Sequence, residues 1–417
     1  MSDLAFLGGE PVRRTPFPDW PFYGEEEEKS VLATLRTHKL CCAAGGQTVH
    51  RFEEAFAAWC GAPGAVATTT GTSALHAAFA AAGIGPGDEV IVPSYTFVST
   101  ASAVLMLGAI PVFADVVRDT LNIDPESVRE RLTDRTKAIA VVHANGLPVD
   151  MDPINALARP KGILVIEDCS HAHGAGYRGK SAGVLGDIAA FSFQMKKILP
   201  IGEGGMVVSR EQKFLDRAWD FVNLAKGGKT GQLGYNLRMH ELQGALGLAF
   251  LPKVDGHNET RRRNAETLKK AVAGLPGIRP APAAPPEDVR EVYYNFIFDF
   301  DAHAAGIDRT AFLEAVKAEG VPLQRNGYVP LHTLALFEEM RERPYRLPEN
   351  APILKGRRLY GKGVCPVAEA AIAEGNIELK VHPPRGEQEM ADVGTAIRKV
   401  LTHAGDLRAR QEKTAAK

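Results

Sequence analysis

Short apolar segments with the composition of β-strands alternate with helical patterns over residues 65–209. Strands are expected at residues 65–68, 89–93, 110–114, 138–143, 163–167, 189–192 and 205–209. Helices are expected between them at residues 71–82, 97–107, 124–132 and 153–158. Because parallel strands need crossover connections, this alternation predicts βα units and an α/β fold, with a mainly parallel sheet covered by helices on both faces.

The chain has 417 residues, which is long for a single core and favours two domains. Residues 1–24 are rich in Pro, Gly and aromatics and predict an extended arm, followed by a large domain over residues 25–252. Helical patterns at 254–273, 309–319 and 387–402, an alternating strand pattern at 292–300 and a proline-rich run at 280–286 predict a smaller α+β domain over residues 253–405. Residues 406–417 are polar, and we expect a frayed tail.

Composition excludes several classes of function. The net charge is −1, with 49 basic and 50 acidic residues, so nothing favours nucleic acid. No signal peptide and no membrane-spanning stretch is recognisable, and we expect a cytoplasmic protein without membrane contact. The five cysteines lack zinc-ligand spacing, so we expect reduced thiols and no metal site.

Ligands of parallel α/β sheets bind beyond the carboxyl ends of the strands, so the polar and aromatic residues that follow those ends are the candidates for a site. Thr72 and Ser73 open a helix, where free N–H groups and the helix dipole suit a phosphate, although ordinary helix caps have the same sequence. The spacing of a P-loop and the glycine fingerprint of dinucleotide folds are both absent. An aromatic residue after the strand at 89–93, Tyr95 or Phe97, could lie over a flat ring or belong to the core.

A lysine pair and a carboxylate complete the set at the same edge. Lys196 and Lys197 lie in a loop after the strand at 189–192; a desolvated lysine becomes a nucleophile toward aldehydes, whereas a solvated one is only a surface charge. Asp168 ends a buried strand and could pair with the pyridine nitrogen of pyridoxal 5′-phosphate (PLP), cap a helix or bind a metal. His171 follows it and could stack or hydrogen-bond near the ring.

Several longer segments make the chain recognisable. It resembles the DegT/DnrJ/StrS family of PLP-dependent sugar and cyclitol aminotransferases from about residue 8 to residue 382. The segments that carry the resemblance are 85–97 (GPGDEVIVPSYTF), 121–125 (LNIDP), 165–168 (VIED), 191–193 with 202–205 (FSF and GEGG), and 234–243 (GYNLRMHELQ). The resemblance implies the PLP-dependent transferase fold of type I and an aminotransferase activity with PLP as cofactor and pyridoxamine 5′-phosphate as its intermediate form.

The family pattern implies roles for individual residues. Lys197 matches the Schiff-base lysine, with Lys196 as the alternative, and Asp168 matches the partner of the pyridine nitrogen. Asn236 resembles the residue that a second subunit lends to the phosphate, which implies a homodimer with a shared site. The remaining cofactor contacts implied are Thr72, Ser73 and Ser192 at the phosphate, Phe97 stacked on the ring and His171 near its edge.

The substrate is less constrained than the cofactor. Gln194 and Met195 stand where many sugar-specific members have His-Pro, which resembles the cyclitol and aminohydroxybenzoate branch, whose members often take the amino group from glutamine. We therefore expect transfer from glutamine or glutamate to a keto-sugar or keto-cyclitol. Candidates for gripping the acceptor are Tyr95, His143, Arg238, Tyr328, His332 and His382. The alternatives are a PLP-dependent dehydratase or aromatising enzyme and a PLP-binding regulator without turnover. The retained lysine argues against the family's dehydratases, in which a histidine replaces it.

Overall fold

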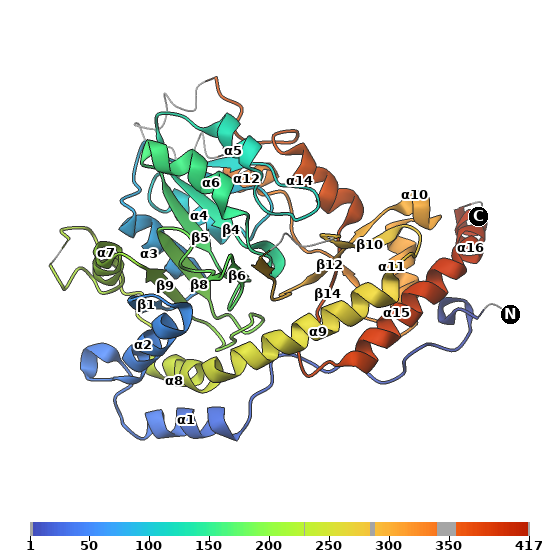
Figure 1. The fold of residues 1–417 in the computed structure, drawn as a ribbon, viewed down its shortest axis with the longest axis horizontal. Helices are drawn as coiled ribbons and strands as arrows, with labels where there is room; N and C mark the ends of the chain where they lie inside the picture. Colours follow the sequence, from blue (N-terminus) through green and yellow to red (C-terminus); the bar gives the residue numbers. More distant parts are fainter. Residues whose placement is uncertain (1–2, 229, 284–287, 340–355, 416–417) are drawn as a thin grey trace.

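The computed structural model describes residues 3–228, 230–283, 288–339 and 356–415. The large domain is built on a seven-stranded sheet with the order β1-β9-β8-β5-β4-β2-β3 (Figure 1). Its strands are β1 Gly64–Thr68, β2 Glu89–Pro93, β3 Ile110–Ala114, β4 Thr136–Val142, β5 Leu164–Asp168, β8 Ile188–Ser192 and β9 Gly205–Ser209. The seven strands expected from the sequence are all present.

The sheet is mainly parallel, as predicted, with one strand reversed. The pairs β3–β2, β2–β4, β4–β5 and β5–β8 are parallel, whereas β9 is antiparallel to both of its neighbours. The reversal follows from the connection, since β8 and β9 are joined by a loop that pairs Ser192 with Gly205 instead of by a crossover helix. The carboxyl ends of β1, β8, β5, β4, β2 and β3 therefore meet at one edge.

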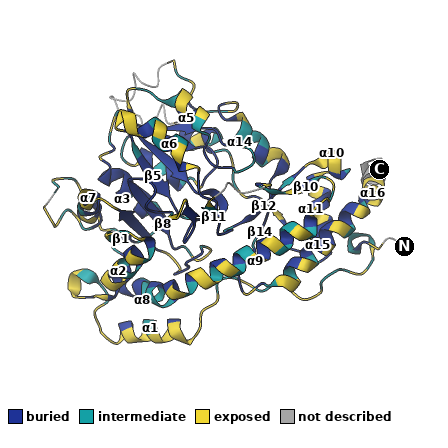
Figure 2. Cartoon of the chain, viewed as in Figure 1, coloured by how far each residue is buried: buried dark blue, intermediate teal, exposed yellow. Residues whose placement is uncertain are grey.

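Helices cover both faces of this sheet, and the side chains of each strand alternate between two cores. Ile188 and Ala190 face a core shared with α3 and α4, whereas Ala189 and Phe191 face one shared with α2 and α8. The strands are accordingly buried on both sides, while α1 is largely exposed (Figure 2). The helices of this domain are α1 Glu25–Leu35, α2 Thr48–Cys60, α3 Gly71–Ala81, α4 Ser99–Leu105, α5 Pro125–Arg131, α6 Met151–Ala158, α7 Gln212–Val222 and α8 Glu241–Phe250.

The second domain contains a four-stranded antiparallel sheet with the order β10-β12-β14-β13. The long helix α9 leads from α8 into this domain and packs beside α15 (Figure 1). The strands are β10 Ile278–Ala281, β12 Phe296–Phe300, β13 Gln324–Arg325 and β14 Ile377–Leu379, and the helices are α9 Val254–Val272, α10 Ala302–Ala305, α11 Arg309–Ala318, α15 Glu387–Thr402 and α16 Ala404–Ala415.

Part of the segment expected in the small domain packs against the large one. Phe337 on α12 (Ala335–Glu338) and Ala368 on α14 (Pro366–Ala370) lie in the core that covers α3 and α4. A small three-stranded sheet, β6 Gly176–Tyr177, β7 Lys180–Ser181 and β11 Val289–Arg290, was not expected from the sequence, because two-residue strands carry no periodic signal.

Residues 3–24 are free of long helices and strands and contain one short 3-10 turn at Ala5–Leu7. Leu4 is buried in the small-domain core, and the backbone N–H of Val12 donates to Glu319. Arg13 forms ion pairs with Glu389 and Asp392 on α15 at 2.9 and 2.7 Å. These contacts hold the arm along the small domain, so that its end reaches the large domain.

Three expectations about element boundaries are corrected. Helix α4 begins at Ser99, which leaves Phe97 in the preceding turn. Strand β12 begins at Phe296 instead of residue 292, because Tyr293 has a left-handed φ of 47° and the N–H of Asn295 donates to Asn145 in the large domain. The tail expected to fray begins as helix α16, which Leu407 anchors in the small-domain core. Residues 284–286 of the proline-rich run lie outside the described residues.

None of the helices in the described ranges combines the length and the apolar character needed to cross a lipid bilayer.

Candidate active site

A pocket of about 600 Å³ lies at the carboxyl edge of the seven-stranded sheet. Each wall comes from a loop that follows a strand end, and two aromatic side chains from the small-domain part of the chain complete it. The lining residues are Thr70, Gly71, Thr72, Leu75, Thr96, Phe97, Ser99, Val142, Asp168, Ser170, His171, Ser192, Gln194, Lys196, Lys197, Glu203, Tyr294 and Tyr328.

Lys197 and Lys196 both line this pocket but differ in environment. Lys197 is partly buried, and its ammonium group lies 4.9 Å from the centre of the Tyr294 ring. Burial lowers the pKa of Lys197 to about 8, although the nearby charge of Asp168 acts in the opposite direction. The side chain of Lys196 is exposed. Lys197 is therefore the lysine with the electrostatics of a nucleophile at neutral pH.

Asp168 ends β5 with its carboxylate in the pocket, whereas the adjacent Glu167 points to the opposite face of the sheet. The hydroxyl of Thr100 donates to Oδ2 of Asp168 at 2.7 Å, and the N–H of Ser170 donates to Oδ1 at 3.1 Å. Thr100 is fully buried and Asp168 is 3 % exposed. Donors to both oxygens fix the orientation of this carboxylate, which suits a partner for a ring nitrogen.

The opposite end of the pocket fits a phosphate. The N–H groups of Gly71 and Thr72 at the start of α3 have no acceptor among the described residues, and the hydroxyl of Thr72 is 2.7 Å from that of Ser99. A Cβ on Gly71 would lie 2.4 Å from the Cβ of Ser192, so only glycine lets α3 approach the end of β8. The residues present thus form a cradle of donors that suits the phosphate of PLP.

Ser73 occupies a different place from the one expected. Its hydroxyl lies 2.9 and 3.0 Å from those of Thr69 and Thr70, and its N–H donates to the side chain of Thr70, the N-cap residue of α3. Ser73 does not line the pocket. The helix cap, which the sequence left as an alternative, accounts for this serine.

His171 lies between two tyrosines of the small-domain part of the chain. Its ring stacks on that of Tyr294 at 4.1 Å with an angle of 9°, and its Nε2 is 3.1 Å from the hydroxyl of Tyr328. Burial lowers the pKa of His171 well below its ordinary value, so the ring is neutral. Its buried Nδ1 has no partner among the described residues, which fits a polar group supplied from outside the chain. Phe97 lines the pocket with 58 % of its surface exposed, a position open to stacking on a bound ring.

Three residues expected to contact the acceptor instead form hydrogen bonds to other residues in the interior of the protein. The hydroxyl of Tyr95 accepts hydrogen bonds from two buried amides. His143 accepts from the N–H of Val149 at Nδ1, and its Nε2 therefore carries the proton and donates to Glu167 at 2.9 Å. His332 bridges Ser94 and Glu369 at 2.7 and 2.8 Å. None of these three lines the pocket, and their partners assign them a structural role.

The other three acceptor candidates differ among themselves. Tyr328 lines the pocket. His382 packs its ring 5.6 Å from that of Trp20, and its Nδ1 is 2.9 Å from the carbonyl of Pro383. Arg238 lines a separate hollow near α2, and the exposed side chain of Asn236 lies two residues before it. Neither Asn236 nor Arg238 reaches the pocket of its own chain.

One buried group of side chains, His143, Glu167 and Cys169, has the donor types of a metal site, with atoms within 4.8 Å of one another. Glu167, however, already accepts hydrogen bonds from His143 and from the N–H groups of Gly183, Leu185 and Gly186. Its oxygens are fully used by the protein, which accounts for the carboxylate without an ion.

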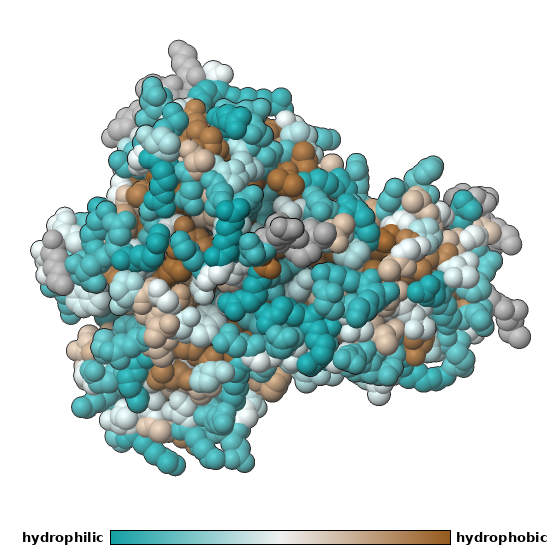
Figure 3. Space-filling view, viewed as in Figure 1, coloured by the Kyte–Doolittle hydropathy of each residue, from teal (hydrophilic) through white to brown (hydrophobic). Residues whose placement is uncertain are grey.

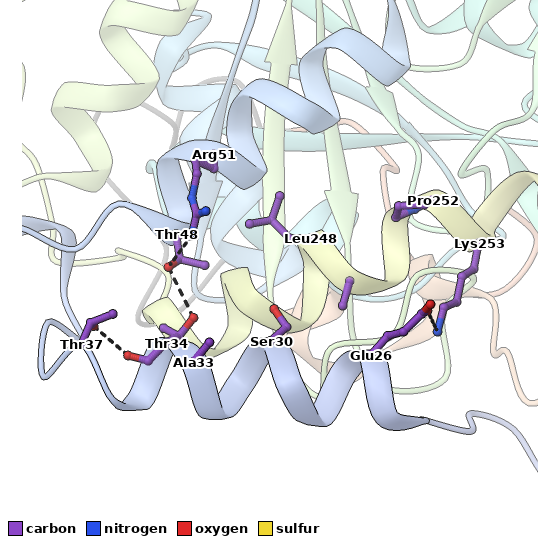
Figure 4. A pocket seen from close by; sticks show the side chains of 11 residues that line it. Glu26, Ser30, Ala33, Thr34, Thr37, Thr48, Arg51, Leu248, Pro252 and Lys253 are labelled. Atoms are coloured by element: carbon purple, nitrogen blue, oxygen red, sulfur yellow. Dashed lines mark hydrogen bonds and ion pairs between the residues drawn. The ribbon is translucent and has the colours of Figure 1, made fainter.

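A second hollow of about 740 Å³ lies between α1 and α8, away from the strand ends. Figure 4 shows Lys253 paired with Glu26, at 2.8 Å, and Thr34 turned toward Thr48, at 3.5 Å. The hollow contains no nucleophile or acid–base pair comparable to Lys197 and Asp168.

The face of the molecule in Figure 3 is mostly hydrophilic, with hydrophobic residues in separate patches.

Sequence reasoning missed Thr100, Tyr294 and Lys380, the last of which lies with its ammonium group 4.0 Å from the centre of the Tyr294 ring. Thr100 sits inside a predicted helix, where it carries no signal of its own. Tyr294 and Lys380 are about a hundred residues or more from the site residues of the large domain, so only the tertiary fold brings them near.

Comparison with known proteins gives consistent results. The sequence model of the DegT/DnrJ/EryC1/StrS aminotransferase family matches residues 21–357. The L-glutamine:2-deoxy-scyllo-inosose aminotransferase of Streptomyces fradiae is 34% identical over 98% of this chain and 99% of its own. Among solved structures, an aminotransferase from Psychrobacter cryohalolentis is 32% identical with a TM-score of 0.82, covering 94% of this chain and 100% of its own. The enzyme DesI, solved in the presence of its TDP-sugar product, is 29% identical with a TM-score of 0.83, covering 98% of this chain and 99% of its own.

Proposed function

The chain belongs to the DegT/DnrJ/EryC1/StrS aminotransferase family, and on that premise we propose that it transfers an amino group from glutamine to a keto-cyclitol. The observation that carries the proposal is the pairing, across one pocket, of a lysine whose pKa is lowered to about 8 with a buried carboxylate. Aminotransferases of this family depend on PLP, so both groups have a partner in the cofactor.

Different residues of the pocket would bind different parts of the cofactor. Lys197 would hold it covalently through Nζ, Asp168 would pair with its ring nitrogen, and Phe97 would cover its ring. Gly71, Thr72 and Ser192 would hold its phosphate. When bound, PLP withdraws electrons from the carbon that carries the amino group, which makes the proton on that carbon removable.

Lys197 then acts as the acid and base of the site. Once the amine of the donor has replaced it on the cofactor, the freed Nζ would accept the proton from the donor carbon and give it back to the carbon of the cofactor that carried the amine. Asp168, held by Thr100, would accept the hydrogen bond of the ring nitrogen. The neutral His171 adds no charge next to Lys197, so the lowered pKa of Lys197 comes from burial.

The choice of donor and acceptor rests on the relatives and on one position of the pocket. The Streptomyces fradiae relative is named for glutamine as donor and 2-deoxy-scyllo-inosose, a keto-cyclitol, as acceptor. Gln194 lines the pocket where many sugar-specific members have histidine. We propose that this chain shares that donor and that class of acceptor.

We propose further that the active enzyme is a homodimer. Asn236 is exposed and outside the pocket of its own chain, although it matches a residue that contacts the cofactor in the family. A partner subunit placed against this surface would bring its own Asn236 to the phosphate end of the pocket.

A nucleotide-linked keto-sugar is the second candidate acceptor, because DesI, of similar fold, was solved with a TDP-sugar product. The experiment that separates the two uses purified protein with PLP and glutamine. Its visible absorbance is followed first with glutamine alone and then with 2-deoxy-scyllo-inosose or a TDP-keto-sugar. Bleaching by glutamine and recovery with the cyclitol alone supports the proposal; recovery with the TDP-sugar alone replaces the acceptor; no change with glutamine refutes the proposed transfer from glutamine.

A further inference from the structure

Three cationic side chains near Tyr294 form no ion pair with a carboxylate of the described residues. The ammonium groups of Lys197 and Lys380 lie 4.9 and 4.0 Å from the centre of the same Tyr294 ring, and Arg261 is buried with its guanidinium 4.7 Å from the Trp20 ring. Within the described ranges, none of the three cations has a carboxylate oxygen within 4.0 Å. Buried charges are normally paired, so this arrangement favours an anion from outside the chain.

Electrostatic effects on these groups agree with that imbalance. Burial, with the charges of Lys197 and Arg261, lowers the pKa of Lys380 to about 8, while Glu378 acts in the opposite direction. Burial likewise lowers the pKa of Arg261 to about 9. An anion beside Lys380 would remove part of this cost.

The fold holds Lys380 in place. It directly follows β14, and the antiparallel register that pairs Phe296 with Leu379 places Asn295 beside it. Lys380 donates to Oδ1 of Asn295, whose amide donates to Asn145 at 2.9 Å. Asn145 in turn donates to the buried Tyr95 hydroxyl at 3.4 Å. This chain of hydrogen bonds fixes the ammonium group beside the ring of Tyr294, which lines the pocket.

We propose that Lys380 forms the subsite that binds the carboxylate of the amino donor. The inference rests on the proposed function, because it assumes that glutamine enters this pocket. The cofactor phosphate is assigned to the start of α3, where Gly71 and Thr72 supply the donors, so it leaves the charge of Lys380 unused. The keto-cyclitol acceptor is uncharged. The donor carboxylate is thus the anion of the reaction that remains for this lysine.

A change in the ligand tests the subsite without any mutation. 4-Aminobutanamide is glutamine without its carboxylate, and the bleaching of the holoenzyme by each amine gives a second-order rate constant. We expect glutamine to be preferred by about 100-fold or more. Lys380→Met should lower the constant for glutamine by about 10- to 100-fold, the range of one charge-assisted hydrogen bond, and leave that for 4-aminobutanamide within about threefold.

Two further variants serve as controls. Lys380→Arg keeps the charge and should retain most of the preference for glutamine. Lys213→Met removes an exposed lysine on α7 whose ammonium group also lies over an aromatic ring, that of Phe214 at 4.6 Å, and should change neither constant. Calorimetric binding of glutaramate, which is glutamine without its amino group, gives a readout independent of turnover and should weaken at least about tenfold in Lys380→Met.

The outcomes separate this inference from the proposed function. If glutamine bleaches the wild type but Lys380→Met lowers both amine constants equally and leaves glutaramate binding unchanged, Lys380 acts on the electrostatics of Lys197 and the subsite is refuted. If Lys380→Met slows only the second half-reaction, with a TDP-keto-sugar, the anion is the acceptor diphosphate. If glutamine fails to bleach the wild type, the proposed function itself is refuted.

Discussion

Thr100 donates a 2.7 Å hydrogen bond to Oδ2 of Asp168, although its place inside α4 marks it as an ordinary helical residue. The bond matters because Asp168 is almost fully buried and is the carboxylate proposed to face the cofactor ring. A second hydroxyl, that of Thr96, lies 2.9 Å from Thr100 and supports it. Thr100 therefore positions Asp168 without touching the cofactor.

Replacing Thr100 with valine should weaken cofactor binding. The change keeps the shape and removes one donor to a charged oxygen, which costs about 1.5–3 kcal/mol, or roughly 10- to 100-fold in the dissociation constant of PLP. Thr100→Ser restores the hydroxyl and should bind within about threefold of the wild type. Equilibrium titration of the apoprotein with PLP measures both; equal weakening in the two variants would mean that packing, and not the hydrogen bond, is responsible.

Lys197→Ala should abolish the covalent attachment of the cofactor, whereas Lys196→Ala should retain it. The physical reason is the difference in environment, since Lys197 is partly buried near Asp168 and Lys196 is exposed. Borohydride reduction of the holoprotein followed by peptide mapping identifies the labelled lysine directly. Label on Lys196 in the wild type would overturn the assignment.

The rate at which the apoprotein captures PLP should depend on pH through Lys197. Attack requires the neutral amine, and a pKa of about 8 means that the rate rises about tenfold per pH unit below 8 and levels off above it. A lysine with the ordinary pKa of 10.5 would give a rate that still rises at pH 10. Since the charge of Asp168 raises the pKa of Lys197, Asp168→Asn should move the midpoint to lower pH.

The stability of a Gly71 variant tests the close approach of α3 to the end of β8, on which the proposed phosphate site depends. A Cβ there would overlap the Cβ of Ser192 at 2.4 Å, so Gly71→Ala should lower the free energy of unfolding by about 1–3 kcal/mol, as other overpacked sites do. Gly85 has no neighbouring atom within 4 Å of its Cβ position, and Gly85→Ala should change stability by less than about 0.5 kcal/mol. Urea unfolding of the two apoproteins compares them; equal stabilities would refute the close approach.

The large-domain side of the pocket could be predicted because it follows from local patterns. Each βα unit is read from a short window, and parallel strands bring their carboxyl ends to one edge, which places Asp168, Ser192 and Lys197 together. The period of two in a strand also separates Asp168 from Glu167, which takes its hydrogen bonds on the other face.

The small-domain side could not be predicted in the same way. Tyr294 lines the pocket and Lys380 lies beside it because β12 pairs with β14, a contact between distant segments that no local sequence pattern predicts. The buried partners of Tyr95, His143 and His332 are equally remote in sequence or hidden by the fold, so a polar residue near a strand end could not be separated from a structural one.

Asn236 provides the test of a shared site. It lies outside the pocket of its own chain, so Asn236→Ala should weaken PLP binding only if a partner subunit brings this side chain to the phosphate.

Mixed dimers of Lys197→Ala and Asn236→Ala subunits sharpen the test. In such a dimer one site lacks both residues, whereas the other combines an intact Lys197 with an intact Asn236 from its neighbour. Random mixing makes about half of the dimers mixed, and each mixed dimer has one intact site. About a quarter of all sites in the mixture should therefore bind PLP tightly and react with glutamine, although neither variant alone does so. If the mixture behaves as the average of the two variants, each subunit builds its site alone, and Asn236 has no role in the partner's pocket.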